Sequence, residues 1–402
     1  DPEDLWAWMA AYEKRTGDRV LAIPHNGNLS NGLMFDVVTL TDRRPLDRDY
    51  AERRMRWEPI YEVTQIKGDG ETHPTLSPND EFADYGTWDR GGFGAAKDPE
   101  MIPREYAREA LKKGLAVEQK LGINPFKFGM IGSTDSHTGL ATTQEDNFFG
   151  KATPVEPGQP GRYEEKITGV LEAPDGRDYT IRHYKGLASG LAGIWATANT
   201  REALFDAMRR KEVYATTGTR MTVRVFAGWD FAADEVHRPD FAETGYSRGV
   251  PMGGDLNAAP KGASPRFMVR ALRDPDGANL DRIQIVKGWL ATDGSLQEKV
   301  YDVAWAGDRE PDAQGKLPPV GNTVQGARFT NAIGTALLMG YWQDPDFDAS
   351  ERAVYYVRVL EIPTPTWLAH DKAYFGDAIE LPSDAAMVQQ ERAYTSPIWY
   401  TP

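Results

Sequence analysis

The sequence contains no cysteine. This absence excludes disulfides, thiolate catalysis and sulfur-ligated metal sites, so any metal must be held by nitrogen and oxygen ligands. Basic residues are scarce relative to acidic ones, 46 against 60, which gives a net charge of -14. Such a chain repels nucleic acid and anionic membranes at long range, so neither is expected as a partner. No run approaches the roughly 18 uninterrupted apolar residues that predict a membrane-spanning helix.

The chain is long enough, at 402 residues, to form two or three domains with sizeable cores. Its hydrophobic content of 40% and charged content of 26% are those of an ordinary globular protein, not of a disordered one. The sequence begins at Asp1 without an initiator methionine or a signal sequence, and a complete amphipathic helix is expected over 2–16. We therefore expect a mature or truncated form that lacks an upstream segment.

The first third of the chain alternates expected helices with short expected strands. Helical spacing of apolar residues and charged faces predict the helices, and runs of β-branched and aromatic residues predict the strands. The expected helices cover 2–16, 43–58 and 103–121, and the expected strands cover 19–23, 59–66 and 128–131. Polar residues follow all three strands. This recurrence is typical of an α/β barrel, in which active sites collect at the carboxyl ends of the strands.

The clearest candidate site follows the third of these strands. The apolar run 128–131 predicts a buried strand, and Gly132 and Ser133 allow a sharp turn at its end. Asp135 and His137 follow two residues apart, which in an extended segment places a carboxylate and an imidazole on the same side, within reach of one cation. The alternative is a polar turn in which Asp135 caps the backbone and His137 is solvated.

The other two strand ends carry weaker candidates. His25 follows the first strand among turn-forming asparagines, so it is either a metal ligand or a structural histidine. Lys67, Glu71 and His73 follow the second strand within seven positions and are candidates for substrate binding. The alternative for these three residues is a simple polar turn.

The pattern changes after residue 220. Short alternating strands separated by turns predict a β-sandwich-like arrangement. These strands are expected at 222–227, 266–272, 282–286, 300–305 and 354–360. Arg220, at the junction, is a further candidate for binding an anionic substrate, with a plain surface arginine as the alternative.

Two domains are therefore expected. Residues 1–220 should form an α/β barrel with a polar, proline-rich and glycine-rich insertion at about 151–186 that leads away from it. Residues 221–402 should form a mostly β, sandwich-like domain, whose C-terminal tail packs back on the barrel.

Three stretches resemble a known superfamily. The sequence Gly-Ser-Thr-Asp-Ser-His-Thr at 132–138 resembles the last metal-binding motif of the PHP (polymerase and histidinol phosphatase) superfamily. Ile-Pro-His-Asn-Gly-Asn at 23–28 resembles its histidine-containing strand end, and Tyr-Glu-Val at 61–63, followed by Lys67, resembles the strand between them. Over nearly all of its length, the chain resembles more closely a bacterial family of PHP-like proteins of unknown function that are typically exported.

That resemblance implies a distorted α/β barrel in which His25, Asp135 and His137 are ligands of divalent ions, Zn, Mn or Fe. PHP proteins open with a His-x-His strand, which this chain does not contain. Those ligands would lie upstream of Asp1, so we expect the chain to hold only part of the site. A partial ligand set need not retain the metal. The alternative is that the family's chemistry has been lost. An upstream segment of the same protein is thus an expected partner, beside a small-molecule substrate, and a periplasmic or secreted location is expected.

Three functions follow as hypotheses. The first is a metal-dependent hydrolase, acting on a phosphoester through metal-activated water. The absence of cysteine and of a Gly-x-Ser-x-Gly motif agrees with a route that needs no nucleophilic side chain. The second is hydrolysis of a carboxyl or carbamate ester on the same scaffold. The third is a non-catalytic protein that binds a glycan or a partner and retains the barrel as a relic.

Overall fold

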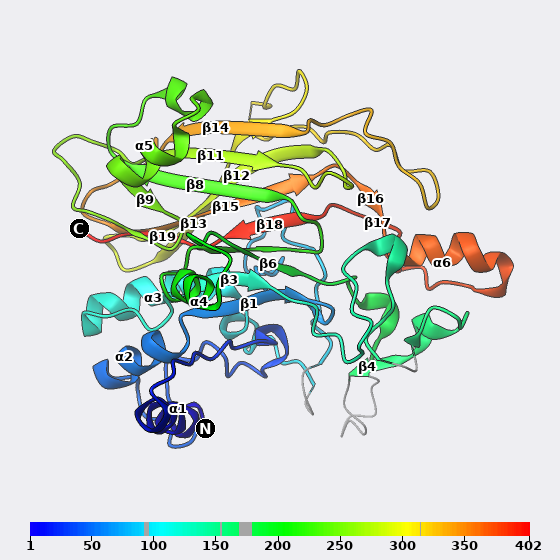
Figure 1. Ribbon diagram of the computed structural model, residues 1–402, viewed down its shortest axis with the longest axis horizontal. Coiled ribbons are helices and arrows are strands. Elements are labelled where there is room, and N and C mark those ends of the chain that lie inside the picture. The colour runs from blue at the N-terminus through cyan, green and yellow to red at the C-terminus, as the bar shows by residue number, and fades with distance from the viewer. Residues whose placement is uncertain (92–95, 153–154, 169–178, 314) are drawn as a thin grey trace.

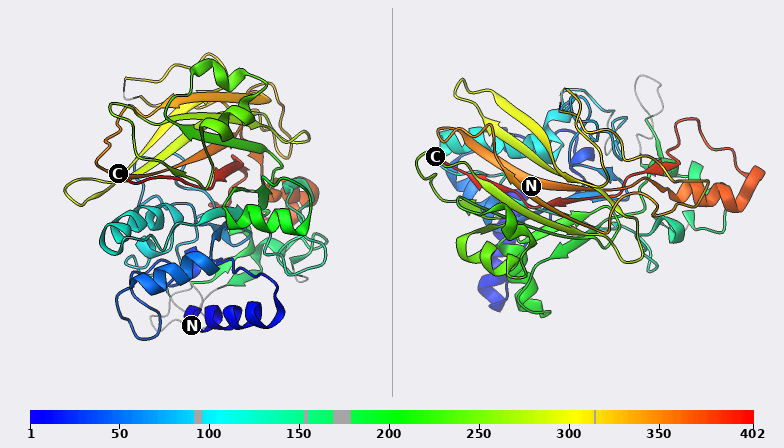
Figure 2. Two further views of the ribbon diagram at one scale, coloured as in Figure 1. Left: turned by 60° about the vertical axis from the view of Figure 1, so that its left-hand side comes forward. Right: turned by 90° about the horizontal axis from the view of Figure 1, so that it is seen from above.

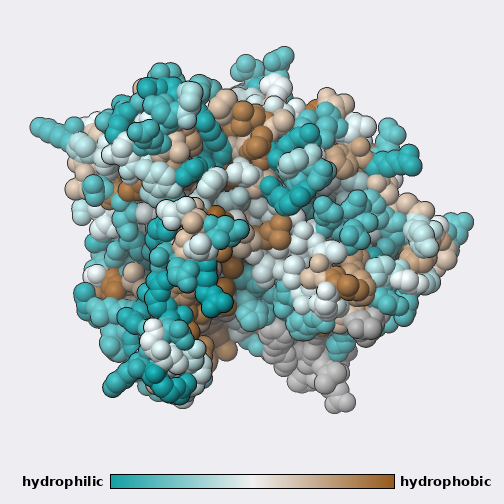
Figure 3. Space-filling view, in the orientation of Figure 1, coloured by the Kyte–Doolittle hydropathy of each residue, from teal (hydrophilic) through white to brown (hydrophobic). Residues whose placement is uncertain are grey.

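The computed structural model describes residues 1–402 except 92–95, 153–154, 169–178 and 314. Helices and strands alternate along the chain, and the protein is of the mixed α/β class (Figure 1). No sheet formed by the described residues closes into a barrel. Among these residues, no helix is long and apolar enough to cross a membrane. Hydrophilic residues cover most of the face shown in Figure 3, with hydrophobic residues in small patches.

The first two helices begin and end where local sequence signals place them. The helix expected over 2–16 is confirmed: the side chain of Asp1 accepts a hydrogen bond from the backbone N–H of Glu3, and Gly17 adopts a left-handed conformation. The helix expected over 43–58 is shorter, because Asp47 caps it by accepting from the N–H of Tyr50. The described helices are α1 (Pro2–Thr16), α2 (Arg48–Trp57), α3 (Ala107–Leu121), α4 (Arg201–Arg209), α5 (Phe241–Arg248) and α6 (Trp367–Phe375).

A small sheet holds the expected strands on either side of α3. It has the order β2-β1-β3, with β1 (Ile60–Gln65) parallel to β3 (Gly129–Gly132) and antiparallel to the short β2 (Gly68–Asp69). Every residue of β1 is buried, as expected for a strand covered on both faces. The parallel pairing brings the carboxyl ends of β1 and β3 to the same edge.

A large sheet joins the two segments that the sequence separates at residue 220. It takes β6 (Leu191–Ile194) and β7 (Val213–Thr216) from the first segment, and all its other strands from the second. These are β10 (Asp255–Leu256), β12 (Leu280–Leu290), β13 (Leu296–Trp305), β15 (Arg352–Glu361), β18 (Arg392–Thr395) and β19 (Ile398–Tyr400). The C-terminal strand β18 lies between β15 and β7, so the tail of the chain completes the sheet.

A third sheet covers one face of the large one. It has the order β14-β11-β8-β9, with β8 (Thr222–Gly228), β9 (Gly249–Pro251), β11 (Arg266–Leu272) and β14 (Leu337–Gln343). Buried residues of β8 and β11 pack against those of β12 and β15 in one apolar cluster. The opposite face of the large sheet packs on α3 and the small sheet through a second cluster. Figures 1 and 2 show the resulting layers, with α1 and α2 outermost on the side of the small sheet.

The expected insertion at about 151–186 lies partly outside the described residues. Its described part includes β4 (Lys166–Thr168) and β5 (Ile181–Arg182), which pair with each other. Tyr163 of this segment packs in one apolar cluster with Trp367 of α6, at one end of the molecule (Figure 1). A two-stranded sheet of β16 (Thr364–Pro365) and β17 (Val388–Gln389) flanks α6.

The strand expected at 19–23 is wrong. The segment makes only isolated backbone hydrogen bonds among the described residues. The Ala22 N–H donates to the carbonyl of Trp57, at the end of α2, over 2.7 Å, and the Pro24 carbonyl accepts from the N–H of Glu62 in β1 at 3.0 Å. Pro24 has no N–H to donate to a ladder, and Asn26 adopts a left-handed conformation with φ of 58°. The chain therefore turns away before a strand can form.

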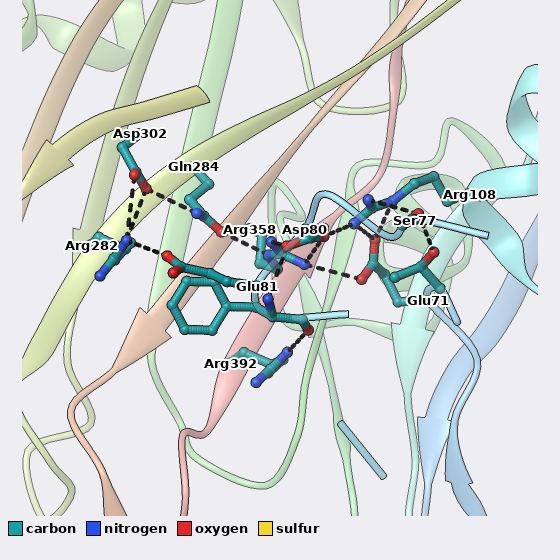
Figure 4. Close-up of polar contacts among 12 residues, drawn as sticks. Glu71, Ser77, Asp80, Glu81, Arg108, Arg282, Gln284, Asp302, Arg358 and Arg392 are labelled. Carbon is teal, nitrogen blue, oxygen red and sulfur yellow. Dashed lines mark hydrogen bonds and ion pairs between the residues drawn. The ribbon is translucent and has the colours of Figure 1, made fainter. Parts of the chain in front are cut away.

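A buried cluster of charges connects the layers. Arg108 of α3 donates to Glu71, 2.6 Å away, and to Asp80 at 2.8 Å, and Arg358 of β15 donates to Asp80 at 2.7 Å (Figure 4). All four side chains are at most 3% exposed. Burial alone would raise the pKa of Asp80, but Arg358 and Arg108 outweigh it and hold that pKa well below its usual value. The loop that follows β2 is thus fixed to both α3 and the large sheet.

Replacing Arg358 by alanine should lower the free energy of unfolding by about 3–5 kcal/mol, because Asp80 and Glu71 would each lose a buried cationic partner. The change is measured by urea unfolding followed by circular dichroism. Arg48→Ala is the matched control, since Arg48 forms an exposed ion pair with Glu52 in α2 and its loss should cost at most about 1 kcal/mol. Equal losses in the two variants would contradict this account of the cluster.

Candidate functional site

Four strands come together at one edge of the small sheet. The N–H of Ser133, after β3, donates to the carbonyl of Thr64 in β1 at 3.1 Å, and the N–H of Gly190, before β6, donates to the Ser133 carbonyl at 2.9 Å. A Cβ atom on Gly132 would lie 2.6 Å from the carbonyl oxygen of Thr216 in β7. Only glycine allows so close an approach, so the small residues at the end of β3 are required for this junction.

Asp135 is the centre of the site. Its backbone is in the left-handed region, with φ of 47°, which turns the chain just beyond β3. Its carboxylate contacts the Lys67 ammonium, lies 2.9 Å from the Lys151 ammonium, and has an oxygen 3.2 Å from Nε2 of His137. The N–H of His137 also donates to the Lys151 carbonyl at 2.8 Å. The site thus has two cations, one imidazole and one carboxylate in mutual contact.

The two ammonium groups lie inside, and the imidazole lies at the surface. The side chains of Lys67 and Lys151 are 8% and 11% exposed, Asp135 is 14% exposed and His137 is 64% exposed. A ligand approaching from solvent would therefore meet His137 first and the lysines behind it.

A second layer of polar groups lies beneath the lysines. Glu62 of β1 is buried and accepts a hydrogen bond from the Ser133 hydroxyl. The Gln65 amide donates to Glu62 at 3.1 Å and to the side-chain oxygen of Asn26 at 2.9 Å. The Gln65 side-chain oxygen accepts from the N–H of Lys67 at 3.0 Å, which ties this layer to the first one.

Burial and mutual repulsion change the acid–base properties of the site. Burial, followed by the charge of Lys151, lowers the pKa of Lys67 to about 7, while Glu62 opposes the shift. Burial also lowers the pKa of Lys151 to about 8. The positive charge of Lys151, with burial second, lowers the pKa of His137. His137 is therefore largely neutral at pH 7 and able to accept a proton.

The structure brings together three of the residues that the sequence marks as site candidates: Lys67, Asp135 and His137. Among the described residues, no hydrogen bond or ion pair joins His25 to them, although its neighbour Asn26 accepts from the Gln65 amide. Its side chain is exposed and lines a hollow whose walls are largely apolar, with Leu33 among its neighbours there. Its role as a metal ligand stays a prediction.

The remaining candidates lie elsewhere. Glu71 belongs to the buried charge cluster with Arg108 and accepts from its guanidinium. His73 is buried, with Nδ1 at 2.7 Å from the Thr75 hydroxyl. Arg220 forms ion pairs with Asp274, at 2.9 Å, and Asp276 at a different surface. Their roles in substrate binding stay predictions, and their present partners are structural.

Two residues of the site were missed by sequence reasoning. Lys151 begins the segment expected to lead away from the site, and no local pattern marks it. Glu62 carried a signal that was available: a carboxylate within the apolar strand 60–65 is costly to bury without a purpose or a partner.

The described residues fit a metal ion incompletely. Asp135 and His137 lie side by side, as the resemblance implies, but two ligands are fewer than the three that a catalytic metal commonly takes from a protein. No group of three or more histidine, aspartate or glutamate side chains in the described ranges could hold an ion. Lys67 and Lys151 moreover neutralise the Asp135 carboxylate, which weakens it as a metal ligand.

The fold and the site define a mixed α/β protein with a lysine-rich polar site at the carboxyl ends of parallel strands. Comparison with known families gives the particular group: the chain belongs to the family described as protein of unknown function DUF3604, which matches residues 1–402. Searches of curated proteins and of solved structures found no match.

Replacing Lys151 by glutamine should raise the pKa of His137, because the positive charge that opposes imidazole protonation is removed. The measurement is an NMR titration of the imidazole protons, with His137 identified among the six histidines by a His137→Gln variant. Lys151→Arg keeps the charge and should leave the His137 pKa lowered. An unchanged His137 pKa in Lys151→Gln would contradict the electrostatic coupling.

Proposed function

We propose that this protein is a hydrolase that acts on phosphoesters at the carboxyl ends of β1 and β3. The observation that carries the proposal is the convergence of two buried lysines, a carboxylate and a neutral imidazole on one point. Beyond the mixed α/β class, the proposal assigns residues 1–220 to a distorted PHP-type barrel and residues 221–402 to a sandwich-like domain.

The two lysines account for binding of the anionic group. In the free protein, Lys67 and Lys151 share the single carboxylate of Asp135, with Glu62 as the nearest further negative charge. Because the pKa of Lys67 is about 7, an anion bound beside it would favour its charged form, and both lysines would then be ammonium groups. A phosphoryl group carries negative charge on several oxygens and would contact both lysines through charge-assisted hydrogen bonds.

His137 accounts for the proton transfer. Its Nε2 lies 3.2 Å from Asp135, so a hydrogen bond from Nε2–H to the carboxylate leaves Nδ1 free of a proton. This tautomer makes Nδ1 the group that accepts a proton from the attacking water. Asp135 then orients the imidazole and stabilises its positive charge as it forms.

Hydrolysis of carboxyl or carbamate esters is the competing proposal. Such substrates are neutral at the reacting group, so they would leave the lysine pair without a role in binding. The charge of the site therefore favours a phosphoester.

The test is a panel of chromogenic phosphomonoesters, phosphodiesters and carboxyl esters, assayed with chelator and with added Zn²⁺ or Mn²⁺. We expect turnover of a phosphoester, and a fall in kcat/KM of about 10²- to 10⁴-fold in His137→Gln, the usual contribution of a general base. Lys151→Gln should raise KM for the phosphoester more strongly than Lys151→Arg, which keeps the charge.

His237→Gln is the control, since His237 is exposed on a short 3₁₀ turn of the second segment and has no place in the site. Its activity should equal that of the unaltered protein. Turnover of carboxyl esters alone would overturn the phosphoester assignment, and unchanged activity in His137→Gln would overturn the role of the imidazole.

A further inference from the structure

A cavity lies at the carboxyl end of strand β15. Its volume is about 570 Å³, within the range of roughly 300–1,000 Å³ that holds small organic ligands. Its walls come from the chain at 143–146, the turn at 274–278, the loop at 327–329 and the end of β15. These segments are far apart in sequence.

The walls carry an excess of carboxyl groups. The acidic side chains that line the cavity are Glu145, Asp146, Asp274, Asp276, Glu361 and Glu391. Asp274 and Asp276 are paired with Arg220. Arg328 and His370 also line the cavity, but neither forms an ion pair with a carboxylate in the part of the chain that the structure describes. Glu145, Glu361 and Glu391 form no ion pair within the described ranges, although the positive charge of Arg273 acts on Glu361 and that of Arg392 acts on Glu391.

Glu361 is the most unusual of these groups. It is fully buried, and within the described ranges neither of its carboxyl oxygens has a hydrogen-bond partner. Glu361 lines the cavity, as do Glu391, Asp274 and Thr219, which influence its pKa together with Arg273 outside the lining. The hydroxyl of Thr219 is likewise buried and lies beside this carboxyl group. Burying an acid in this way is unfavourable unless a partner compensates it.

The neighbouring acids are also short of positive charge. The Gln389 amide donates to both Glu145 and Glu391, at 2.5 Å each, and so bridges two carboxyl groups with a neutral donor. Burial, followed by the charge of Glu391, raises the pKa of Glu145 to about 8, and burial raises that of Glu391 to about 7. Burial and Glu391 raise the pKa of Glu361 well above its usual value. A bound cation would favour the ionised form of all three.

The size and lining of the cavity identify the kind of cation. The carboxyl groups are spread around the walls, and no three of them among the described residues could hold one metal ion. Phe329, Pro365, Ala278 and Ala327 add apolar surface, which a metal ion does not use. An organic molecule with a charged amine and an apolar body matches both parts of the lining.

We propose that this cavity binds an organic cation through a primary ammonium group that pairs with Glu361. The ammonium has three donors, which suit the two free oxygens of Glu361 and the hydroxyl oxygen of Thr219. The apolar part of the ligand lies against Phe329 and Pro365. This site is separate from the one at Asp135 and does not depend on the function proposed for it.

The test uses 2-phenylethylamine as the probe and 2-phenylethanol as its neutral counterpart, with binding to the full chain measured by isothermal titration calorimetry. We expect saturable binding of the amine and at least about tenfold weaker binding of the alcohol, because a charge-assisted hydrogen bond is lost. Glu361→Gln should weaken amine binding by at least about tenfold, and Glu391→Gln should weaken it less.

Glu202→Gln, an exposed change on α4, is the control and should bind the amine as the unaltered protein does. Circular dichroism establishes that Glu361→Gln is folded; if that variant is not folded, Glu391→Gln and the comparison of amine with alcohol decide. Equal binding of amine and alcohol, unchanged amine affinity in folded Glu361→Gln, or absence of saturable amine binding would overturn the proposal. Binding of Ca²⁺ alone, with no amine binding, would also overturn it, in favour of a metal.

Discussion

The burial of charged side chains between the layers is the constraint on which much of this structure depends. Arg108 and Arg358 are removed from water together with Glu71 and Asp80, and each charge is compensated by the others. Buried charges are tolerated only with well-placed partners, so the helix, the loop and the sheet that carry these side chains must pack in one fixed arrangement. Lys67 lies four residues before Glu71, in the turn between β1 and β2. The cluster therefore also fixes the approach of Lys67 to the site.

The candidate site is built by the backbone as much as by its side chains. The ends of β3, β6 and β7 approach so closely that Gly132 has no room for a side chain, and Asp135 follows in a left-handed turn. That turn directs a carboxylate at two lysines from segments 84 residues apart, Lys67 and Lys151. Two lysines are thus gathered at one point of a chain whose net charge is -14. Such a site attracts an anion from surroundings that otherwise repel it.

The site at Asp135 and the cavity at Glu361 have opposite electrostatic character. At Asp135 the cations exceed the carboxylates in direct contact, whereas at Glu361 the carboxyl groups exceed the cations. The chain that leads from His137 to Glu145 connects them in sequence. Both regions contain buried ionisable groups with shifted pKa values, a feature that is concentrated at functional sites.

Local signals in the sequence determined a good part of the fold. The helices α1 and α3 and the strands β1, β3, β8, β11, β12, β13 and β15 were expected within a few residues of their bounds, because helical spacing, caps and β-branched runs are local properties. The strand β14 and the helices α5 and α6 were not expected. The strand at 19–23 was predicted wrongly, since an apolar run does not reveal whether an adjacent strand is available for regular backbone hydrogen bonding.

For the site, the sequence by itself determined that Asp135 and His137 lie together at a strand end and that Lys67 follows a parallel strand. Only the tertiary structure decided that Lys151 joins them, that Arg220 is held by Asp274, and that Glu361 is buried without a partner. It also decided that the described sheets do not close into a barrel and that the two halves of the chain share one large sheet. The physical reason is the range of the interactions: capping and periodicity act over a few residues, whereas desolvation and ion pairing depend on what the rest of the chain brings near.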